Sequence, residues 1–169
     1  MSESAAETTE VRLNESSRTQ IDQWLAKFPA DRRRAAVLAA LTIAQDQNGG
    51  WLPKSLLNDV AEHLRIPPIQ VYEAASFYSL FHLKPVGRHK ISICDNISCM
   101  LCGADEIIGH VRQKLGIGLG ETTADGRITL VKEEECLAAC VGAPMMVVDG
   151  HYHENLTPSK VDAIIDALE

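Results

Sequence analysis

The amino-acid sequence predicts an α+β protein in which a small helical bundle is followed by a mixed α/β domain. Through the first half, apolar residues recur at steps of three and four, which is the period of an amphipathic helix. From residue 88 the pattern changes to the alternation of apolar and polar residues that is typical of a half-buried strand. Four of the five cysteines form two close pairs, each after a predicted strand. These observations place a domain boundary near residue 87 and the candidate functional residues in the second half.

Three helices are predicted in the first half of the chain. They span residues 35–47, 53–64 and 68–83. Gly49 and Gly50 end the first helix, because glycine readily takes the left-handed conformation that closes a helix. Pro53 stands near the first turn of the second helix, where no N–H is needed. Residues 18–87 are therefore expected to form a helical domain, preceded by a disordered acidic tail at residues 1–17.

The second half, residues 88–169, has the predicted order β-α-β-β-β-α. Asp149 and Gly150 form the sequence of a two-residue hairpin turn between the last two strands. Thr157 followed by Pro158 is a typical start of a helix. Strands are expected at residues 89–94, 127–132, 145–149 and 152–155, and helices at residues 103–115 and 158–168.

Composition limits the possible classes of function. The 169 residues include 16 Lys and Arg against 23 Asp and Glu, and the net charge of -7 opposes binding to nucleic-acid phosphates or anionic lipid. The longest apolar run, residues 35–44, is about half of the roughly 20 residues that a membrane helix needs. The first residues have neither the basic start nor the apolar core of a secretory signal. We therefore expect a cytoplasmic protein that neither binds nucleic acid nor inserts into a membrane.

The cysteines are the strongest functional signal. Cys94 and Cys99 are spaced as C-x4-C, and Cys136 and Cys140 as C-x3-C. In a reducing compartment, clustered thiols bind metal more often than they form disulfides. A [2Fe-2S] cluster needs four thiolates, two on each iron, and two pairs on neighbouring loops meet this need. Zinc also accepts four cysteines, but these spacings are loose for the knuckles of structural zinc sites, so zinc is the alternative.

Cys102 permits a second ligand set. With Cys94 and Cys99 it spells C-x4-C-x2-C, the opening of the plant-type ferredoxin pattern, and the fourth ligand would then come from the later pair. The paired set is favoured because a helix is predicted to begin at Gly103, whereas a plant-type loop is a longer irregular wrap. Cys102 is then expected to be a small buried residue in the first helical turn. Its C-x-x-C spacing from Cys99 leaves a thiol redox protein as a further alternative.

The remaining polar residues form no catalytic constellation in the sequence. Ser76 and Ser98 lack the His and Asp arrangement that would activate a nucleophile. His151 and His153 share one face of a short strand, but no further ligand pattern points to them, so both are interpreted as surface residues. Acidic residues beside the cysteines, at positions 95 and 133–135, favour a low reduction potential. The expected role is electron transfer.

Several longer motifs resemble those of a known family over roughly residues 34–168. In the helical half they are QDQNGGWL (residues 45–52), VAEHLRIP (60–67) and VYEAASFYSLF (71–81). In the second half they are CDNISC (94–99), TTADGRITL (122–130), CLAACVGAP (136–144) and HENLTP (153–158). The family is that of the thioredoxin-like [2Fe-2S] subunit, the E subunit, of the NADH-oxidising module of bacterial NADH:quinone oxidoreductase (respiratory complex I).

The resemblance implies a fold and a ligand set. The second half is expected to be a thioredoxin-like domain, residues 88–169. Ala138 stands where many members of the family have glycine. Pro144 precedes a strand as the cis-proline of thioredoxin-like folds does, which predicts a cis Ala143–Pro144 bond. The implied ligands of one [2Fe-2S] cluster are the cysteines that match those of the family motifs, Cys94, Cys99, Cys136 and Cys140.

The resemblance also implies partners and a location. FMN, the NADH site and a [4Fe-4S] cluster are expected in a partner flavoprotein subunit, on which the helical domain docks. The chain would then be one subunit of a proton-translocating oxidoreductase, without a complete active site of its own. It would lie in the peripheral arm, on the cytoplasmic side of the inner membrane. Similar subunits serve NAD-reducing hydrogenases and NAD-dependent formate dehydrogenases, which is the alternative assignment.

Overall fold

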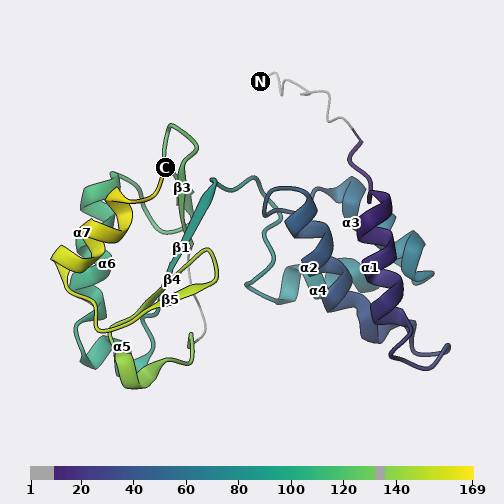
Figure 1. Cartoon of the computed structure of the whole chain (residues 1–169), viewed down its shortest axis with the longest axis horizontal. Helices are drawn as coiled ribbons and strands as arrows, with labels where there is room; N and C mark the ends of the chain where they lie inside the picture. Colours follow the sequence, from purple (N-terminus) through teal and green to yellow (C-terminus); the bar gives the residue numbers. More distant parts are fainter. Residues whose placement is uncertain (1–9, 132–135) are drawn as a thin grey trace. The chain divides into compact units, whose positions relative to one another are not determined.

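A computed structural model describes residues 10–131 and 136–169 of the chain. It divides into two compact units between Pro85 and Val86. In its described residues the first unit consists of helices joined by turns and loops, and the second holds a five-stranded sheet with helices (Figure 1). None of the helices in the described segments is long and apolar enough to cross a membrane.

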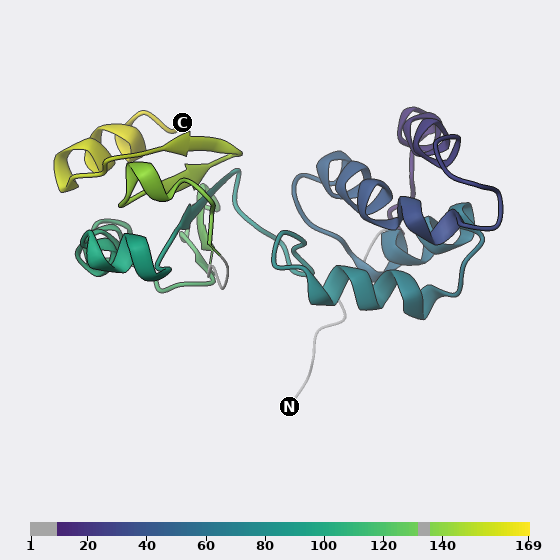
Figure 2. The same cartoon turned by 90° about the horizontal axis from the view of Figure 1, so that it is seen from below.

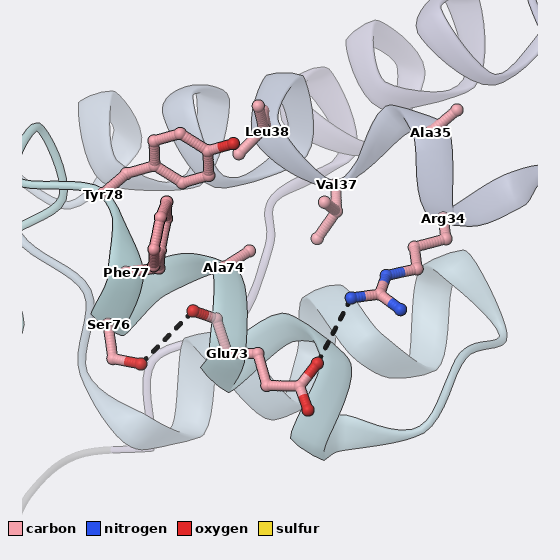
Figure 3. A pocket seen from close by; sticks show the side chains of 9 residues that line it. All are labelled: Arg34, Ala35, Val37, Leu38, Glu73, Ala74, Ser76, Phe77 and Tyr78. Carbon is pink, nitrogen blue, oxygen red and sulfur yellow. Dashed lines mark hydrogen bonds and ion pairs between the residues drawn. The ribbon is translucent and has the colours of Figure 1, made fainter.

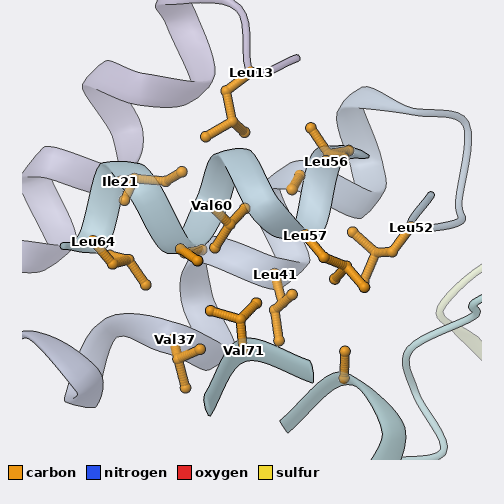
Figure 4. Close-up of a cluster of buried hydrophobic side chains, with 14 of the residues drawn as sticks. Leu13, Ile21, Val37, Leu41, Leu52, Leu56, Leu57, Val60, Leu64 and Val71 are labelled. Atoms are coloured by element: carbon orange, nitrogen blue, oxygen red, sulfur yellow. The ribbon is translucent and has the colours of Figure 1, made fainter. Parts of the chain in front are cut away.

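The helical unit is built around one apolar core. Its helices are α1 (Glu15–Leu25), α2 (Val37–Gln47), α3 (Lys54–Leu64) and α4 (Pro68–Phe77), with a 3-10 turn η1 (Arg33–Ala36) before α2. Leu41, Leu56, Leu64 and Val71 are fully buried at its centre (Figure 4). Burying a side chain of this size stabilises the fold by about 1.5–3 kcal/mol. The helical spacing of apolar residues in α2 and α3 is the pattern from which these helices were predicted.

Helix α1 begins inside the segment that we predicted to be a disordered tail. Asn14 caps it, because its side chain accepts a hydrogen bond from the N–H of Ser17 at 2.8 Å. Leu13 is buried, and its N–H donates to Oδ2 of Asp59 at 2.7 Å. The structure thus corrects the prediction for residues 10–17, while residues 1–9 lie outside the described part of the chain.

Helix α4 ends at Phe77, six residues before the predicted end. Tyr78 takes an extended conformation, and the chain beyond it forms hydrogen bonds with another part of the unit. The side-chain amide of Gln45 donates to the carbonyl of Leu80 at 3.0 Å, and its oxygen accepts from the N–H of His82 at 2.8 Å. These bonds to α2 replace the helical bonds that periodicity alone had suggested.

The second unit is a mixed sheet with the strand order β2-β3-β1-β4-β5 (Figures 1 and 2). Strand β1 pairs in parallel with β3 and antiparallel with β4. Ile107 of α6 and Val161 of α7 are buried in the same core as Ile91 and Leu130 of the sheet. The strands are β1 (His89–Ile93), β2 (Glu121–Thr122), β3 (Ile128–Val131), β4 (Met146–Val148) and β5 (His151–His153), and the helices are α5 (Ile97–Leu101), α6 (Ala104–Leu115) and α7 (Pro158–Asp166).

The predicted element order is confirmed in this unit, with three additions. Strand β2, the one-turn helix α5 and the 3-10 turn η2 (Cys140–Gly142) are too short to produce a periodic signal, and none of them was predicted. Asp149 and Gly150, both with positive φ, form the predicted hairpin turn between β4 and β5. The Ala143–Pro144 bond is cis, as predicted.

Candidate metal centre

The first pair of thiols lies at the carboxyl end of β1. Cys94 follows the last residue of the strand, and Cys99 lies on the inner side of α5. Asn96 caps this short helix through a bond from the N–H of Ile97 to its side chain. Cys94 and Cys99 are each 1% exposed, and their side chains form a hydrogen bond. The strand end and the capped turn thus bring two thiols together in the protein interior.

The second pair follows β3, the parallel neighbour of β1. Because parallel strands end at the same edge of a sheet, the second pair is carried by a loop at the same edge as the first. The Sγ atoms of Cys136 and Cys140 lie 3.5 Å apart. This separation exceeds the roughly 2 Å of a disulfide, and both cysteines are free. Both are exposed, in contrast to the first pair.

The pKa of Cys99 depends on thiols of both pairs. Burial raises the pKa of the Cys99 thiol to about 11, and its hydrogen bond with Cys94 adds to the increase. The N–H of Met145 donates to Cys99 and opposes this increase. A smaller contribution comes from the charge of Cys140, which places the second pair within electrostatic range of the first. Metal binding would replace the proton on Cys99, since the thiolate is the ligand.

The loop of the second pair is shaped by three unusual backbone features. Ala138 has a φ of 64°, in the left-handed region, and its N–H points at Sγ of Cys136 at 3.4 Å. Gly142 leaves no room for a side chain, because a Cβ there would lie 2.5 Å from the Cβ of Glu154. The carbonyl of Gly142 accepts from the N–H of Asn155 at 2.6 Å. Sequence reasoning missed these supports, although alanine in a position often held by glycine was a signal at Ala138.

The donor set matches the needs of a two-iron cluster. Four thiols are available as two pairs, and a [2Fe-2S] cluster takes two thiolates on each iron. Within residues 10–131 and 136–169, no group of three or more His, Cys, Asp or Glu side chains is placed to hold a metal ion.

The other residues considered in the sequence differ in their exposure. Cys102 ends α5 and is exposed, which corrects the expectation that it is buried. Asp95 is also exposed, whereas the three acidic residues at 133–135 lie outside the described residues. His151 is exposed and His153 half-buried on the edge strand β5, in agreement with their interpretation as surface residues.

The helical unit carries a separate apolar groove of about 710 Å³. Val37 and Leu38 of α2 form one wall, and Phe77 and Tyr78 at the end of α4 form the other (Figure 3). Phe77 is 79% exposed, although it is one of the largest apolar side chains. An ion pair between Arg34 and Glu73, with N and O 3.2 Å apart, borders the groove.

Known protein structures share this fold. Over 80% of the chain, the structure superposes with a TM-score of 0.61 and 23% identity on the crystal structure of an NAD+-reducing [NiFe]-hydrogenase in the air-oxidized state. The chain spans about a fifth of that hydrogenase chain, 22% of its length.

Sequence relatives are more similar. The chain is 45% identical over 144 residues to the E subunit of the NADH-quinone oxidoreductase of Rickettsia bellii, which covers 85% of this chain and 86% of the relative. It is 38% identical over 163 residues to the mitochondrial NADH dehydrogenase [ubiquinone] flavoprotein 2 of Dictyostelium discoideum, covering 96% of this chain and 66% of the relative. Residues 21–169 match the family profile of the thioredoxin-like [2Fe-2S] ferredoxins. The chain therefore belongs to the thioredoxin-like [2Fe-2S] ferredoxin family.

Proposed function

We propose that this chain is the electron-transfer subunit of the NADH-oxidising module of an NADH:quinone oxidoreductase. The observation that carries the proposal is the position of four free thiols as two pairs, one after β1 and the other after its parallel neighbour β3. Relatives that are 45% identical over most of the chain are named as the E subunit of NADH-quinone oxidoreductase, which supports this assignment. The proposed ligands of one [2Fe-2S] cluster are Cys94, Cys99, Cys136 and Cys140.

When bound, such a cluster supplies one-electron transfer. The residues of the chain hold it and set its surroundings. The N–H groups of Ala138 and Met145 point at ligand sulfurs, where they offset negative charge. Exposed Asp95 acts in the opposite direction, because a nearby negative charge opposes the addition of an electron. Burial of Cys94 and Cys99 keeps water from one side of the centre.

The proposed partner is a flavoprotein subunit that carries FMN, the NADH site and a [4Fe-4S] cluster. NADH oxidation would take place there, because this chain supplies no complete active site in the proposal. We assign binding of that subunit to the helical domain, where the groove between α2 and α4 exposes Phe77 and Leu38. The proposed location is the peripheral arm of the complex, on the cytoplasmic side of the inner membrane.

The equivalent subunit of an NAD-reducing hydrogenase is the second candidate, together with that of an NAD-dependent formate dehydrogenase. Its support is the shared fold with the hydrogenase chain at a TM-score of 0.61. The oxidoreductase is preferred because its relatives are 45% identical, against 23% for the hydrogenase.

Anaerobic purification followed by visible absorption, iron counting and EPR before and after dithionite tests the cluster. We expect a reddish protein with two irons per chain and an S = 1/2 signal on reduction. Cys140→Ser should lose or alter this signal, and the matched control Cys102→Ser should leave it unchanged. A colourless wild-type protein that holds one zinc per chain would refute the proposal. Loss of the signal in Cys102→Ser would instead support the plant-type ligand set.

A further inference from the structure

A groove of about 460 Å³ lies between the edge strand β5 and helix α7 of the second unit (α7 is yellow in Figure 2). This volume falls within the roughly 300–1,000 Å³ of small-molecule pockets. The lining of the groove includes none of the five cysteines, all of which lie in the described part of the chain. The groove is therefore a feature separate from the metal centre.

The interior of the groove is apolar. Ala163 and Ala167 are four residues apart, so they lie on the same face of α7 and its C-terminal cap, and their methyl groups leave the space open. Ile164 and Leu168 also line the groove, and both pack against the core beneath the sheet. Val148 of β4 lines it as well and is buried. An apolar chain bound in the groove would therefore extend the core of the unit.

Positive charge gathers at the end of the groove where α7 begins. Lys160 lies in the first turn of α7, and its Nζ donates to the carbonyl of Glu154 at 2.5 Å, which leaves two of its three N–H donors for another acceptor. His153 of β5 lines the groove and is half-buried. Burial, followed by the charges of Lys160 and His151, lowers the pKa of His153. A bound anion would offset the repulsion between these groups.

The acidic side chains nearby are engaged elsewhere. Asp149 also lines the groove, but both of its carboxylate oxygens are hydrogen-bonded to residues of β1, at 2.6 and 2.8 Å. The carboxylate of Glu154 lies against Gly142. Among the described residues, no carboxylate forms an ion pair with Lys160 or with His153. The groove thus combines an apolar interior with a positive end that has no counter-charge from this part of the chain.

We propose that this groove binds an amphipathic carboxylate, the anion of a medium-chain fatty acid. The carboxylate lies between Lys160 and His153, and the alkyl chain follows α7 toward Ala167. These ends of the helix are seven residues, or about 10 Å, apart. A single small anion is favoured over an anionic membrane, because the net charge of -7 opposes a charged surface but not a local ion pair. The site shares no residue with the proposed electron-transfer function and goes beyond it.

Calorimetric titration of the anaerobic full-length holoprotein with decanoate, at about pH 7 where the acid is ionised, tests the site. We expect one decanoate per chain, with a dissociation constant of about 1 mM or lower. Decanol and the decyltrimethylammonium cation have the same apolar chain without the negative charge. Each should bind at least about fivefold more weakly, because neither forms a charge-assisted hydrogen bond with the lysine.

Variants of the groove separate its two parts. Lys160→Met should weaken decanoate binding at least about fivefold, because it removes the charged donor and keeps a long side chain. Lys54→Met is the matched control, at an exposed lysine in the first turn of α3, and should change binding less than about twofold. Ala163→Phe should weaken binding at least about tenfold, because its ring occupies the groove. The gain in wild-type affinity from about pH 8 to about pH 6 should be smaller in His153→Gln.

A folded wild-type chain that binds no decanoate would overturn the proposal, and so would equal affinity for decanoate and decyltrimethylammonium. Unchanged binding in both Lys160→Met and Ala163→Phe would overturn it too, because the acid would then bind elsewhere. Thermal unfolding of each variant shows that it is folded, and Ala163 is an exposed position where a larger side chain fits. EPR of the metal centre reports separately on the proposed electron-transfer function, so the failure of one proposal is distinguishable from that of the other.

Discussion

The N–H of Ala138 donates a hydrogen bond to Sγ of Cys136 at 3.4 Å, and a left-handed conformation of Ala138 directs it there. The left-handed conformation costs alanine about 1–2 kcal/mol, whereas glycine adopts it without this cost. The strained residue thus lies next to a proposed ligand. The geometry explains why glycine suits this position, as the family motif suggested.

Ala138→Gly should therefore stabilise the protein, by about 1 kcal/mol after the entropy of the unfolded glycine is included. Urea unfolding of the anaerobic holoprotein measures this change. Ala139→Gly is the control, since Ala139 has a φ of -110° and gains nothing from glycine. Equal destabilisation by both variants would contradict the assigned strain.

Gly142→Ala should reduce occupancy of the metal centre. The new Cβ would lie 2.5 Å from the Cβ of Glu154, so the turn that begins at Cys140 must move, at a cost of about 1–3 kcal/mol. Iron content and thermal unfolding report the effect. Gly109→Ala is the matched control, because a Cβ there meets no atom within 4 Å and alanine favours the helix by up to about 1 kcal/mol. An unchanged iron content in Gly142→Ala would show that the turn adjusts freely.

Asp59→Asn should loosen α1. The Asp59 carboxylate is 2% exposed, accepts from Nη2 of Arg18 at 2.8 Å at both oxygens, and accepts from the N–H of Leu13. We expect a loss of about 2 kcal/mol, which is below the roughly 3–5 kcal/mol for breaking a fully buried ion pair because Arg18 keeps part of its hydration. Faster hydrogen exchange in residues 15–25 is the measurement. Asp22→Asn is the control, because Asp22 is an exposed ion-pair partner of His63. It should change the unfolding free energy by less than about 0.5 kcal/mol.

His89 should make stability fall as the pH rises above 6.5. Its Nδ1 lies 2.6 Å from Oδ2 of Asp149 and its Nε2 lies 2.9 Å from the carbonyl of Glu169, and the imidazolium alone donates at both nitrogens. The bond to Asp149, followed by that to Glu169, raises the pKa of His89. Since the folded pKa exceeds the unfolded one, the stabilisation is complete below pH 6.5 and is lost as the pH rises through the folded pKa. The difference in unfolding free energy between wild type and His89→Gln should therefore be larger at about pH 6 than at about pH 8.

His153 provides a control with the opposite sign. Burial, followed by the charges of Lys160 and His151, lowers the pKa of His153. Its contribution is therefore present above pH 6.5 and is lost as the pH falls below it. The wild type should therefore lose more unfolding free energy than His153→Gln as the pH becomes acidic. The same pH slope in both variants would contradict the assigned causes.

Local signals in the sequence predicted the parts of the fold that local forces decide. The apolar spacing of α2 and α3 and the Asp149-Gly150 turn needed no knowledge of distant residues. Helix α1 was missed because its start depends on Asp59, 46 residues from Leu13. The early end of α4 depends in the same way on Gln45. Such contacts are formed only in the folded chain.

The same distinction holds at the metal centre. The spacing of the cysteines predicted that they form two pairs. The exposure of Cys102 was not, because it depends on α5, a helix of one turn. The hydrogen bonds to Cys136 and Cys99 come from backbone groups, which every residue type carries, so no residue type indicates them.

The division of the proposed ligands between two loops also has a consequence for the unfolded chain. From Cys99 to Cys136 the chain runs for 37 residues, through α6 and two strands. A metal centre that bridges these loops acts as a cross-link and removes conformations that the free chain could sample. By the chain-entropy relation for disulfides, closing a loop of this length is equivalent to about 4 kcal/mol. The metal centre would then stabilise the fold of the sheet in addition to carrying an electron.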